Sequence, residues 1–217
     1  MKTFILLLGI IAGCFYQVQA QQAEWEFGIQ AESGRDWYHR EYYNWETLPG
    51  GYIPNFPSYR SVGTGFFAER VLNPNLSVLG QIGYVRKKMP VDVFAEASRT
   101  FGKWISKEMH HRGAIDIGMR WYINPKSQIK LFVDGKLGAN MLIAAVQRVE
   151  GFGNVVTWDA FGYNRINPVA SGSVGAKWGR LAISAEYRQD LSQVRRERSS
   201  SGISGKAVVG KVAVTIF

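Results

Sequence analysis

The residues best suited to chemistry are three histidines, two of which are adjacent. His110 and His111 have Ser106 and Glu108 close by, and the third histidine is His39. A hydroxyl, an imidazole and a carboxylate can together supply a nucleophile, its general base and the group that orients the base. The spacings here form no recognisable triad, and no further ligands accompany the histidine pair at metal-binding spacing. We therefore predict no catalytic residue, no metal site and no cofactor.

Basic residues are a second candidate for function. The 217 residues include 26 lysines and arginines against 17 aspartates and glutamates, which gives a net charge of +9. Clustered basic side chains suit phosphate and carboxylate groups, which they bind through charge-assisted hydrogen bonds. Nucleic acid is the other common partner of a basic chain, and the export signal described below argues against it. The candidate anion contacts are Lys87, Lys88, Lys103, Lys107, Arg112, Arg195, Arg196 and Arg198.

Aromatic residues gather in the segment 33–58, between two predicted strands. Aromatic and arginine side chains on a loop are typical of surfaces that recognise proteins or sugars. The same rings would also serve as a lid that packs over the base of the loop, and both interpretations stay open. The candidate recognition residues are Trp37, Tyr38, Tyr42, Tyr43 and Trp45.

The first twenty residues have the pattern of a secretory signal peptide. Lys2 supplies the positive charge, 4–12 the apolar stretch, and 18–20 a small-residue cleavage site. The apolar stretch is too short to span a membrane as a helix. An alternative is a lipobox that ends at Cys14, which would carry lipid after cleavage. The domain predicted to remain, 21–217, has no cysteine, so packing or a closed sheet must hold it together.

Apolar and polar residues alternate through the rest of the chain with a period of two rather than 3.6. This pattern predicts β-strands with one apolar face. In one such segment Ile115 and Ile117 fall on one face, and Asp116 and Arg120 fall on the other. The eight predicted strands cover 23–32, 59–70, 76–87, 112–123, 128–142, 168–178, 181–191 and 205–217.

Short turns and long connections alternate between these strands. The short ones, at 73–75, 124–127 and 179–180, are rich in asparagine, proline and glycine, which favour tight turns. An even number of strands joined in this way is the plan of a transmembrane barrel. We therefore predict an all-β fold, an eight-stranded antiparallel up-and-down transmembrane β-barrel. The long connections cover 33–58, 88–111, 143–167 and 192–204, with a short amphipathic helix expected around 93–105.

The two faces of the predicted sheet favour a membrane barrel. The polar face carries charges of both signs, which suits ion pairs inside a narrow lumen, whereas a soluble lipocalin-like barrel would turn its apolar face inward. Aromatic residues lie at the strand ends near the short turns and the termini, as in the aromatic girdle of a membrane barrel. Eight strands enclose a space that side chains fill, so no open pore is expected. The predicted girdle is Trp25, Trp121, Trp178 and Phe217.

The last strand departs from this regular pattern. Val208, Val212 and Val214 lie on its apolar face, whereas the terminal Phe217 shares the parity of Lys211. A bulge or an irregular end is therefore expected near the carboxy-terminus.

The signal, the eight-strand plan and the terminal Ile216-Phe217 resemble the small outer-membrane barrels of the OmpX and OmpA-barrel kind, especially the "outer membrane protein beta-barrel domain" family of Bacteroidetes. The resemblance is one of pattern and covers the whole exported chain. It implies a place in the outer membrane of a Gram-negative bacterium, with both termini periplasmic. It also implies lipopolysaccharide and lipid as partners of the basic residues, together with the barrel assembly machinery, other envelope proteins or host ligands.

Three functions are compatible with this resemblance. The favoured one is a non-enzymatic surface protein with a structural or adhesive role. A second is the barrel component of an outer-membrane secretion or assembly machine. A third is a lipid A-modifying enzyme, which would require histidine and serine on a strand near the outer leaflet.

Overall fold

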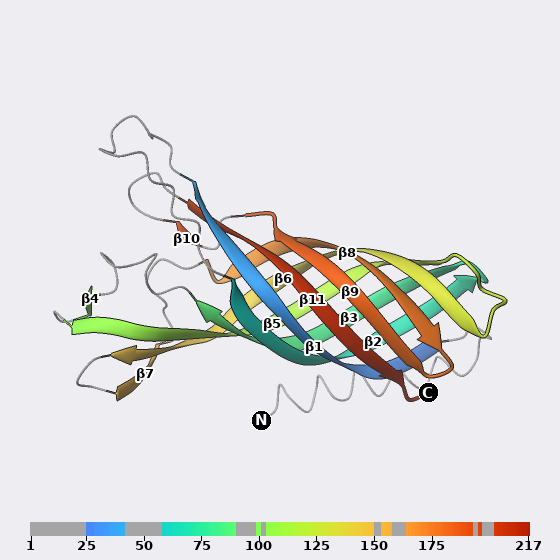
Figure 1. Cartoon of the computed structure of the whole chain (residues 1–217), viewed down its shortest axis with the longest axis horizontal. Coiled ribbons are helices and arrows are strands. Elements are labelled where there is room, and N and C mark those ends of the chain that lie inside the picture. The colour runs from blue at the N-terminus through green and yellow to red at the C-terminus, as the bar shows by residue number, and fades with distance from the viewer. Residues whose placement is uncertain are drawn as a thin grey trace, which may run out of the picture.

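The fold is a closed antiparallel β-barrel built from eight long strands (Figure 1). The structure is a computed structural model that describes residues 25–41, 58–89, 99–100, 103–149, 153–157, 164–192, 195–196 and 202–217. No helix capable of crossing a membrane occurs in these ranges. The long strands are β1 Trp25–Glu41, β2 Tyr59–Asn73, β3 Leu76–Met89, β5 Lys103–Tyr122, β6 Ile129–Val149, β8 Ile166–Trp178, β9 Leu181–Asp190 and β11 Gly202–Thr215; the short ones are β4 Arg99–Thr100, β7 Gly153–Thr157 and β10 Arg195–Arg196.

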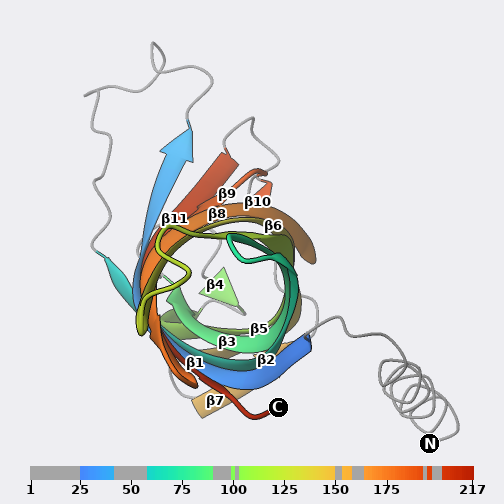
Figure 2. The same ribbon diagram turned by 90° about the vertical axis from the view of Figure 1, so that its right-hand side faces the viewer.

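The long strands close into a ring, as the view along the barrel shows (Figure 2). Their order is β5-β3-β2-β1-β11-β9-β8-β6, and β6 pairs with β5 again. The strands are staggered. A row of register partners followed once around the barrel starts on β5 at His111 and comes back to β5 at Trp121. The row passes through Arg86, Val62, Ser33, Gly210, Ala185, Val174 and Val133. The predicted fold class is confirmed.

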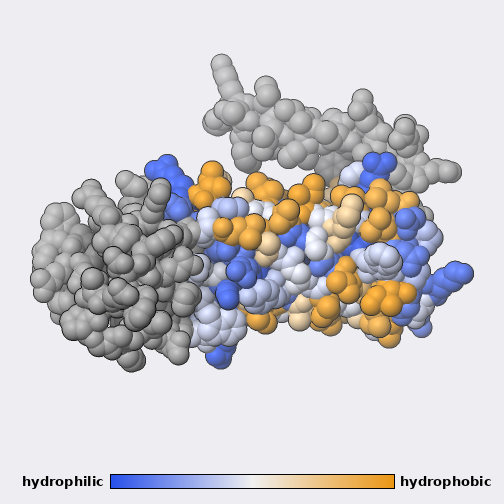
Figure 3. All heavy atoms as spheres, turned by 90° about the horizontal axis from the view of Figure 1, so that it is seen from above, coloured by the Kyte–Doolittle hydropathy of each residue, from blue (hydrophilic) through white to orange (hydrophobic). Residues whose placement is uncertain are grey.

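The barrel is apolar outside and polar inside. Outward side chains on four adjacent strands form an exposed apolar row, and the residues between them along each strand face the lumen. On the face seen in Figure 3, apolar side chains are distributed along the length of the barrel among polar ones. A soluble protein buries such residues, so this exterior is that of a barrel surrounded by lipid. The row consists of Ile29, Phe66, Ile82 and Ile115, exposed by 46%, 66%, 57% and 60%.

The three short turns are held by local hydrogen bonds and by one glycine. The Asn75 amide donates to the Asn73 side chain over 3.0 Å, which is an Asx turn. The Asn124 side chain donates to the Ile129 carbonyl over 2.9 Å, so it bridges the base of the β5–β6 turn. Gly179 opens the two-residue β8–β9 turn at φ +56°, a conformation that glycine adopts without strain. These turns and both ends of the barrel chain lie on one side, here called the turn end.

Several strands continue beyond their predicted bounds at the opposite, loop end. β5 and β6, with the short β7 paired to β6, project past the barrel there (Figure 1). A spanning strand needs only about 9–11 residues, whereas β5 has 20 and β6 has 21. Beyond the lipid no face has to be apolar, so the alternation ends while backbone pairing continues.

These extensions correct the predicted loop positions. Trp37 and Tyr38 lie on β1, and Lys103 and Lys107 lie on β5, rather than in loops. The helix expected around 93–105 is also wrong where the structure describes it, because 99–100 and 103–105 are strand. The signal peptide and Tyr42, Tyr43 and Trp45 lie outside the described residues.

The irregular end of the last strand follows from its pairing with β1. β11 ends at Thr215, and the next two amides share one acceptor: Ile216 N and Phe217 N donate to the Phe27 carbonyl over 2.7 and 3.3 Å. Two residues opposing one is the geometry of a bulge. Lys211 can therefore face the lumen while the Phe217 side chain remains 82% exposed.

Gly28 offers a test of the packing inside the ring. A Cβ there would overlap the Val214 carbonyl oxygen and lie 2.5 Å from the Phe67 ring, whereas a Cβ at Gly135 would meet nothing within 4 Å. We expect Gly28→Val to destabilise the barrel by about 1–3 kcal/mol or more through overpacking and Gly135→Val to be tolerated. Urea unfolding in detergent micelles, with heat-modifiable electrophoretic mobility as the assay of closure, checks this. Equal stability of the two variants would contradict the assigned inward packing of Phe67.

Candidate functional site: the charged lumen and the basic exterior

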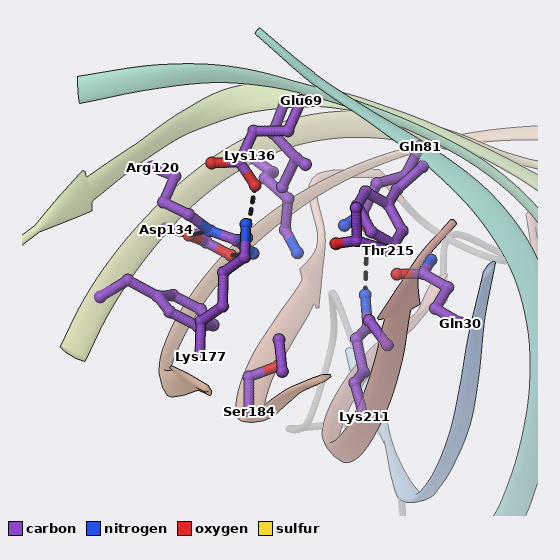
Figure 4. Close-up of a pocket in the computed structure, with 15 residues that line it drawn as sticks. Gln30, Glu69, Gln81, Arg120, Asp134, Lys136, Lys177, Ser184, Lys211 and Thr215 are labelled. Carbon is purple, nitrogen blue, oxygen red and sulfur yellow. Dashed lines mark hydrogen bonds and ion pairs between the residues drawn. The ribbon is translucent and has the colours of Figure 1, made fainter. Parts of the chain in front are cut away.

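The part of the lumen nearest the turns is organised around Arg120 (Figure 4). Its guanidinium donates to both carboxylate oxygens of Asp134, over 2.8 and 3.0 Å, and to Glu69 over 2.8 Å. The Tyr122 hydroxyl donates to the other Glu69 oxygen over 2.7 Å. The guanidinium carbon lies 3.9 Å from the centre of the Phe132 ring. A buried charge is tolerated when paired and fully hydrogen-bonded in this way.

A second cluster in the middle of the lumen is organised around Glu186. Its carboxylate pairs with Lys136, with Arg188 and, over 2.9 Å, with Lys211. Arg188 also donates two parallel bonds to Glu32, of 2.9 and 2.6 Å. This fork-to-carboxylate arrangement is specific to arginine. The cluster joins β1, β6, β9 and β11, so it ties together strands that are distant in the sequence.

The lumen is filled by these side chains. The void among the residues in Figure 4 is about 20 Å³, which is room for about one water molecule. Lys177 and Glu26 form a further pair close to the turn end. In the described part of the chain, the barrel interior is thus a packed ion-pair network, as eight strands predict.

A third cluster lies at the loop end of the lumen and corrects two predicted contacts. Lys87 is 8% exposed and donates to Asp36 over 2.6 Å, and Arg112 is 3% exposed with a nitrogen 3.3 Å from His110 Nδ1. Both cations were expected to meet lipopolysaccharide, but they face inward, where they cannot reach the lipid. His110 is itself fully buried, with Nε2 2.5 Å from a Glu108 oxygen.

The two adjacent histidines face opposite sides of the barrel wall. His110 lies in the lumen, whereas His111 faces outward and forms a hydrogen bond with the Tyr84 hydroxyl. They therefore do not belong to one site. The outward His111 is paired in register with Arg86 on β3 and Ala144 on β6, neither of which supplies a nucleophile or a carboxylate.

Acidic side chains of the described barrel lie only inside, whereas basic side chains lie both inside and outside. All nine acidic residues whose side chains the structure describes face the lumen: Glu26, Glu32, Asp36, Glu69, Glu108, Asp116, Asp134, Glu186 and Asp190. The exposed charged side chains in the same part of the chain are all basic: Arg35, Arg60, Arg70, Arg86, Lys88, Lys126, Lys130, Arg148, Arg165, Arg180 and Lys206.

Of the predicted anion contacts, Lys88 belongs to this exposed set. The side chains of Lys103, Lys107, Arg195 and Arg196 are outside the described part of the structure, as is all of Arg198. Sequence analysis missed Arg35 and Arg60, which lie on β1 and β2 and face outward. The sequence was sufficient to predict this orientation. Arg35 lies an even number of residues from the outward Ile29, and Arg60 lies an even number of residues from the outward Val62.

The aromatic residues divide between the two ends. Trp121, Trp178 and Phe217 are exposed at the turn end, by 61%, 60% and 82%, and Trp25 stacks on Phe27 with ring centres 5.8 Å apart. Their place at the lipid headgroups remains a prediction.

At the loop end the two described recognition residues point in opposite directions. Trp37 is 40% exposed, whereas Tyr38 is buried inside the mouth against Tyr59, with ring centres 6.3 Å apart. This part of the segment therefore combines an outward ring, as recognition requires, with an inward ring, as a lid requires.

Comparison with known proteins shows that this chain is similar in fold to solved structures. No family model matches the chain, and no curated protein matches it in sequence. Among solved structures, Neisserial surface protein A is similar with a TM-score of 0.46 and 11% identity, over 88% of this chain and 97% of that one. Ail, the attachment invasion locus protein of Yersinia pestis, in complex with the heparin analogue sucrose octasulfate, gives 0.43 and 12%, over 88% and 99%. The N-terminal barrel of Pseudomonas aeruginosa OprF gives 0.33 and 8%, over 85% and 96%.

The ion-pair network predicts a large cost for removing its central carboxylate. Glu186→Gln leaves Lys136, Arg188 and Lys211 without their shared anion, and we expect a loss of about 3–5 kcal/mol in the free energy of unfolding. Lys126→Gln, in the exposed β5–β6 turn, is the control and should change stability by no more than about 0.5 kcal/mol. Urea unfolding in micelles, followed by tryptophan fluorescence, measures both. A Glu186→Gln protein as stable as the wild type would show that the ion-pair network does not stabilise the folded barrel.

Proposed function

We propose that this protein is an integral outer-membrane barrel of a Gram-negative bacterium that acts as an anchor for a surface-recognition, adhesive site and contacts lipopolysaccharide around its wall. The observation that carries the proposal is the sorting of charge: acidic side chains pair inside the barrel, and the exposed charges are basic. Such an exterior complements the phosphates of outer-leaflet lipid.

The filled lumen supports an anchoring role rather than a transport role. Solute passage through the barrel would require the Arg120 and Glu186 clusters to separate, and each contains several charge-assisted bonds. The function then belongs to the parts that leave the membrane.

The strand extensions at the loop end support recognition. They raise the long connections above the lipid on a hydrogen-bonded sheet, and the outward Trp37 lies at the base of the most aromatic of these connections. A binding residue on a rigid strand needs less ordering on contact than one on a mobile loop. Host ligands and other envelope proteins are the partners that such a surface would meet.

The turn end supports a second partner, the barrel assembly machinery. Phe217 has its main chain held by β1 while its ring remains exposed. An exposed aromatic ring in this position can be recognised by another protein.

Replacement of residues 42–57 by a glycine-serine segment of the same length tests the recognition role. Bacteria that display this variant should lose most adherence to epithelial cells and to immobilised matrix glycoproteins, because the aromatic contacts are removed. The barrel should keep its heat-modifiable mobility, since its strands are unchanged. A control with only 197–201 replaced should adhere normally. Unaltered adherence of the 42–57 variant, with normal surface amounts, would contradict the proposal.

A further inference from the structure

We infer that the outer wall of β1 and β2 at the loop end is a binding site for one phosphorylated glycolipid of the outer leaflet, whose phosphate is held between Arg35 and Arg60. The inference rests on the outer-membrane placement proposed above. It adds a defined site, a ligand class and a set of residues.

The first observation is a pair of like charges placed opposite each other. Arg35 on β1 and Arg60 on β2 are direct cross-strand partners, and both are exposed. Such a pair lies about 4.5–5.5 Å apart at Cβ and is destabilising by itself. Of the described acidic side chains, none lies on this outer wall to relieve the repulsion. A bound anion would do so, and two guanidinium groups match the oxygens of a phosphate.

The neighbouring residues increase and fix this positive charge. The Arg35 guanidinium donates to the Ser58 hydroxyl over 3.1 Å, which orients it beside Arg60. On β3, Arg86 pairs in register with Val62, so it lies diagonally across from Arg60. Lys88 is exposed on the same strand, with its amine 5.8 Å from the centre of the Tyr59 ring. Three cations, Arg35, Arg60 and Arg86, therefore lie on three adjacent strands of the outer wall, and Lys88 is exposed at the mouth beside Tyr59.

The second observation is a groove at this place. It has a volume of about 560 Å³ and is lined by Ser33, Gly34, Trp37, Ser58 and Val208 together with the two arginines. This volume lies in the range of small-molecule sites, about 300–1,000 Å³. The void at the centre of the lumen, by contrast, is about 20 Å³. The groove is a broad, open depression on the outside of the barrel, so a phosphorylated sugar would lie against the two arginines rather than be enclosed.

The order of residues along the wall selects a lipid rather than a free anion. On the membrane side of the arginines the outward pairs are Ser33 with Val62, then Ala31 with Thr64, and then the large apolar pair Ile29 with Phe66. On the other side stand Trp37, 40% exposed, and its register partner Lys206. The acyl chains therefore have an apolar surface at Ile29 and Phe66, and the phosphate-bearing sugar has a cationic surface flanked by Trp37.

Binding of lipid A to the full-length purified protein tests the site. Vesicles of neutral phospholipid with and without bisphosphorylated lipid A are incubated with the protein in mild detergent, and bound lipid is counted by native mass spectrometry. We expect one tightly held lipid A per chain. Arg35→Gln with Arg60→Gln should weaken binding by about ten-fold or more, as loss of charged hydrogen bonds implies. Arg35→Lys with Arg60→Lys keeps the charge and should recover only part of the affinity.

The control replaces two exposed arginines at the turn end, Arg70→Gln with Arg180→Gln, and should bind as the wild type does. Equal weakening in this control, or unaltered binding in the Arg35 and Arg60 variant, would overturn the site. Inorganic phosphate that competes as well as lipid A would overturn the assignment to a lipid. Fractionation of the wild type and of these variants separates the two proposals: absence of the wild type from the outer membrane would refute the proposed function, whereas normal placement of the Arg35 and Arg60 variant with unaltered lipid A binding refutes this inference alone.

Discussion

The whole structure depends on the need to pair every backbone hydrogen-bonding group in lipid. An open sheet would leave the outer edges of β5 and β6 unpaired in the membrane, at a cost of several kcal/mol for each group. Direct pairing of β5 with β6 removes both edges. Once eight strands are closed, the diameter is fixed, and the interior has room only for side chains. The content of the lumen is therefore a consequence of backbone closure.

Closure in turn dictates where charge can be placed. Charged inward side chains are excluded from lipid and nearly excluded from water, so pairing with opposite charges across the ring stabilises them. Arg188 and Glu32 meet although they are 156 residues apart in the chain. Because the acidic side chains are used inside, the wall outside is left with basic ones near the two edges of the apolar belt. The cationic groove around Arg35 and Arg60 is thus linked to the same segregation of charge that fills the lumen.

The sequence predicted the strands, the turns and the antiparallel plan because these depend on local alternation and on residues such as Asn73 and Gly179. The sequence analysis placed Lys87 and Arg112 on the outside of the barrel, although the alternation along their strands predicts that both face the lumen. Lys87 shares the parity of the inward Gln81, and Arg112 shares that of the inward Arg120, so extending the alternation past the predicted loop boundary would have placed both inside. The ion-pair partners could not be predicted, because they depend on the stagger with which β5 meets β6, and no local pattern encodes it. The strand extensions were missed for a different reason: outside lipid, pairing continues without an apolar face.

The central claim is that neighbouring residues on one strand face lipid and lumen in turn, and it can be measured directly because the predicted mature chain has no cysteine. Single cysteines at Ile82 and Gln81, and at Phe66 and Phe67, would each be labelled with bimane in protein reconstituted into vesicles that contain brominated lipid. Strong quenching at 82 and 66 with little quenching at 81 and 67 is the predicted result. Strong quenching at 81 and 67 with little at 82 and 66, or equal quenching throughout, would contradict the account.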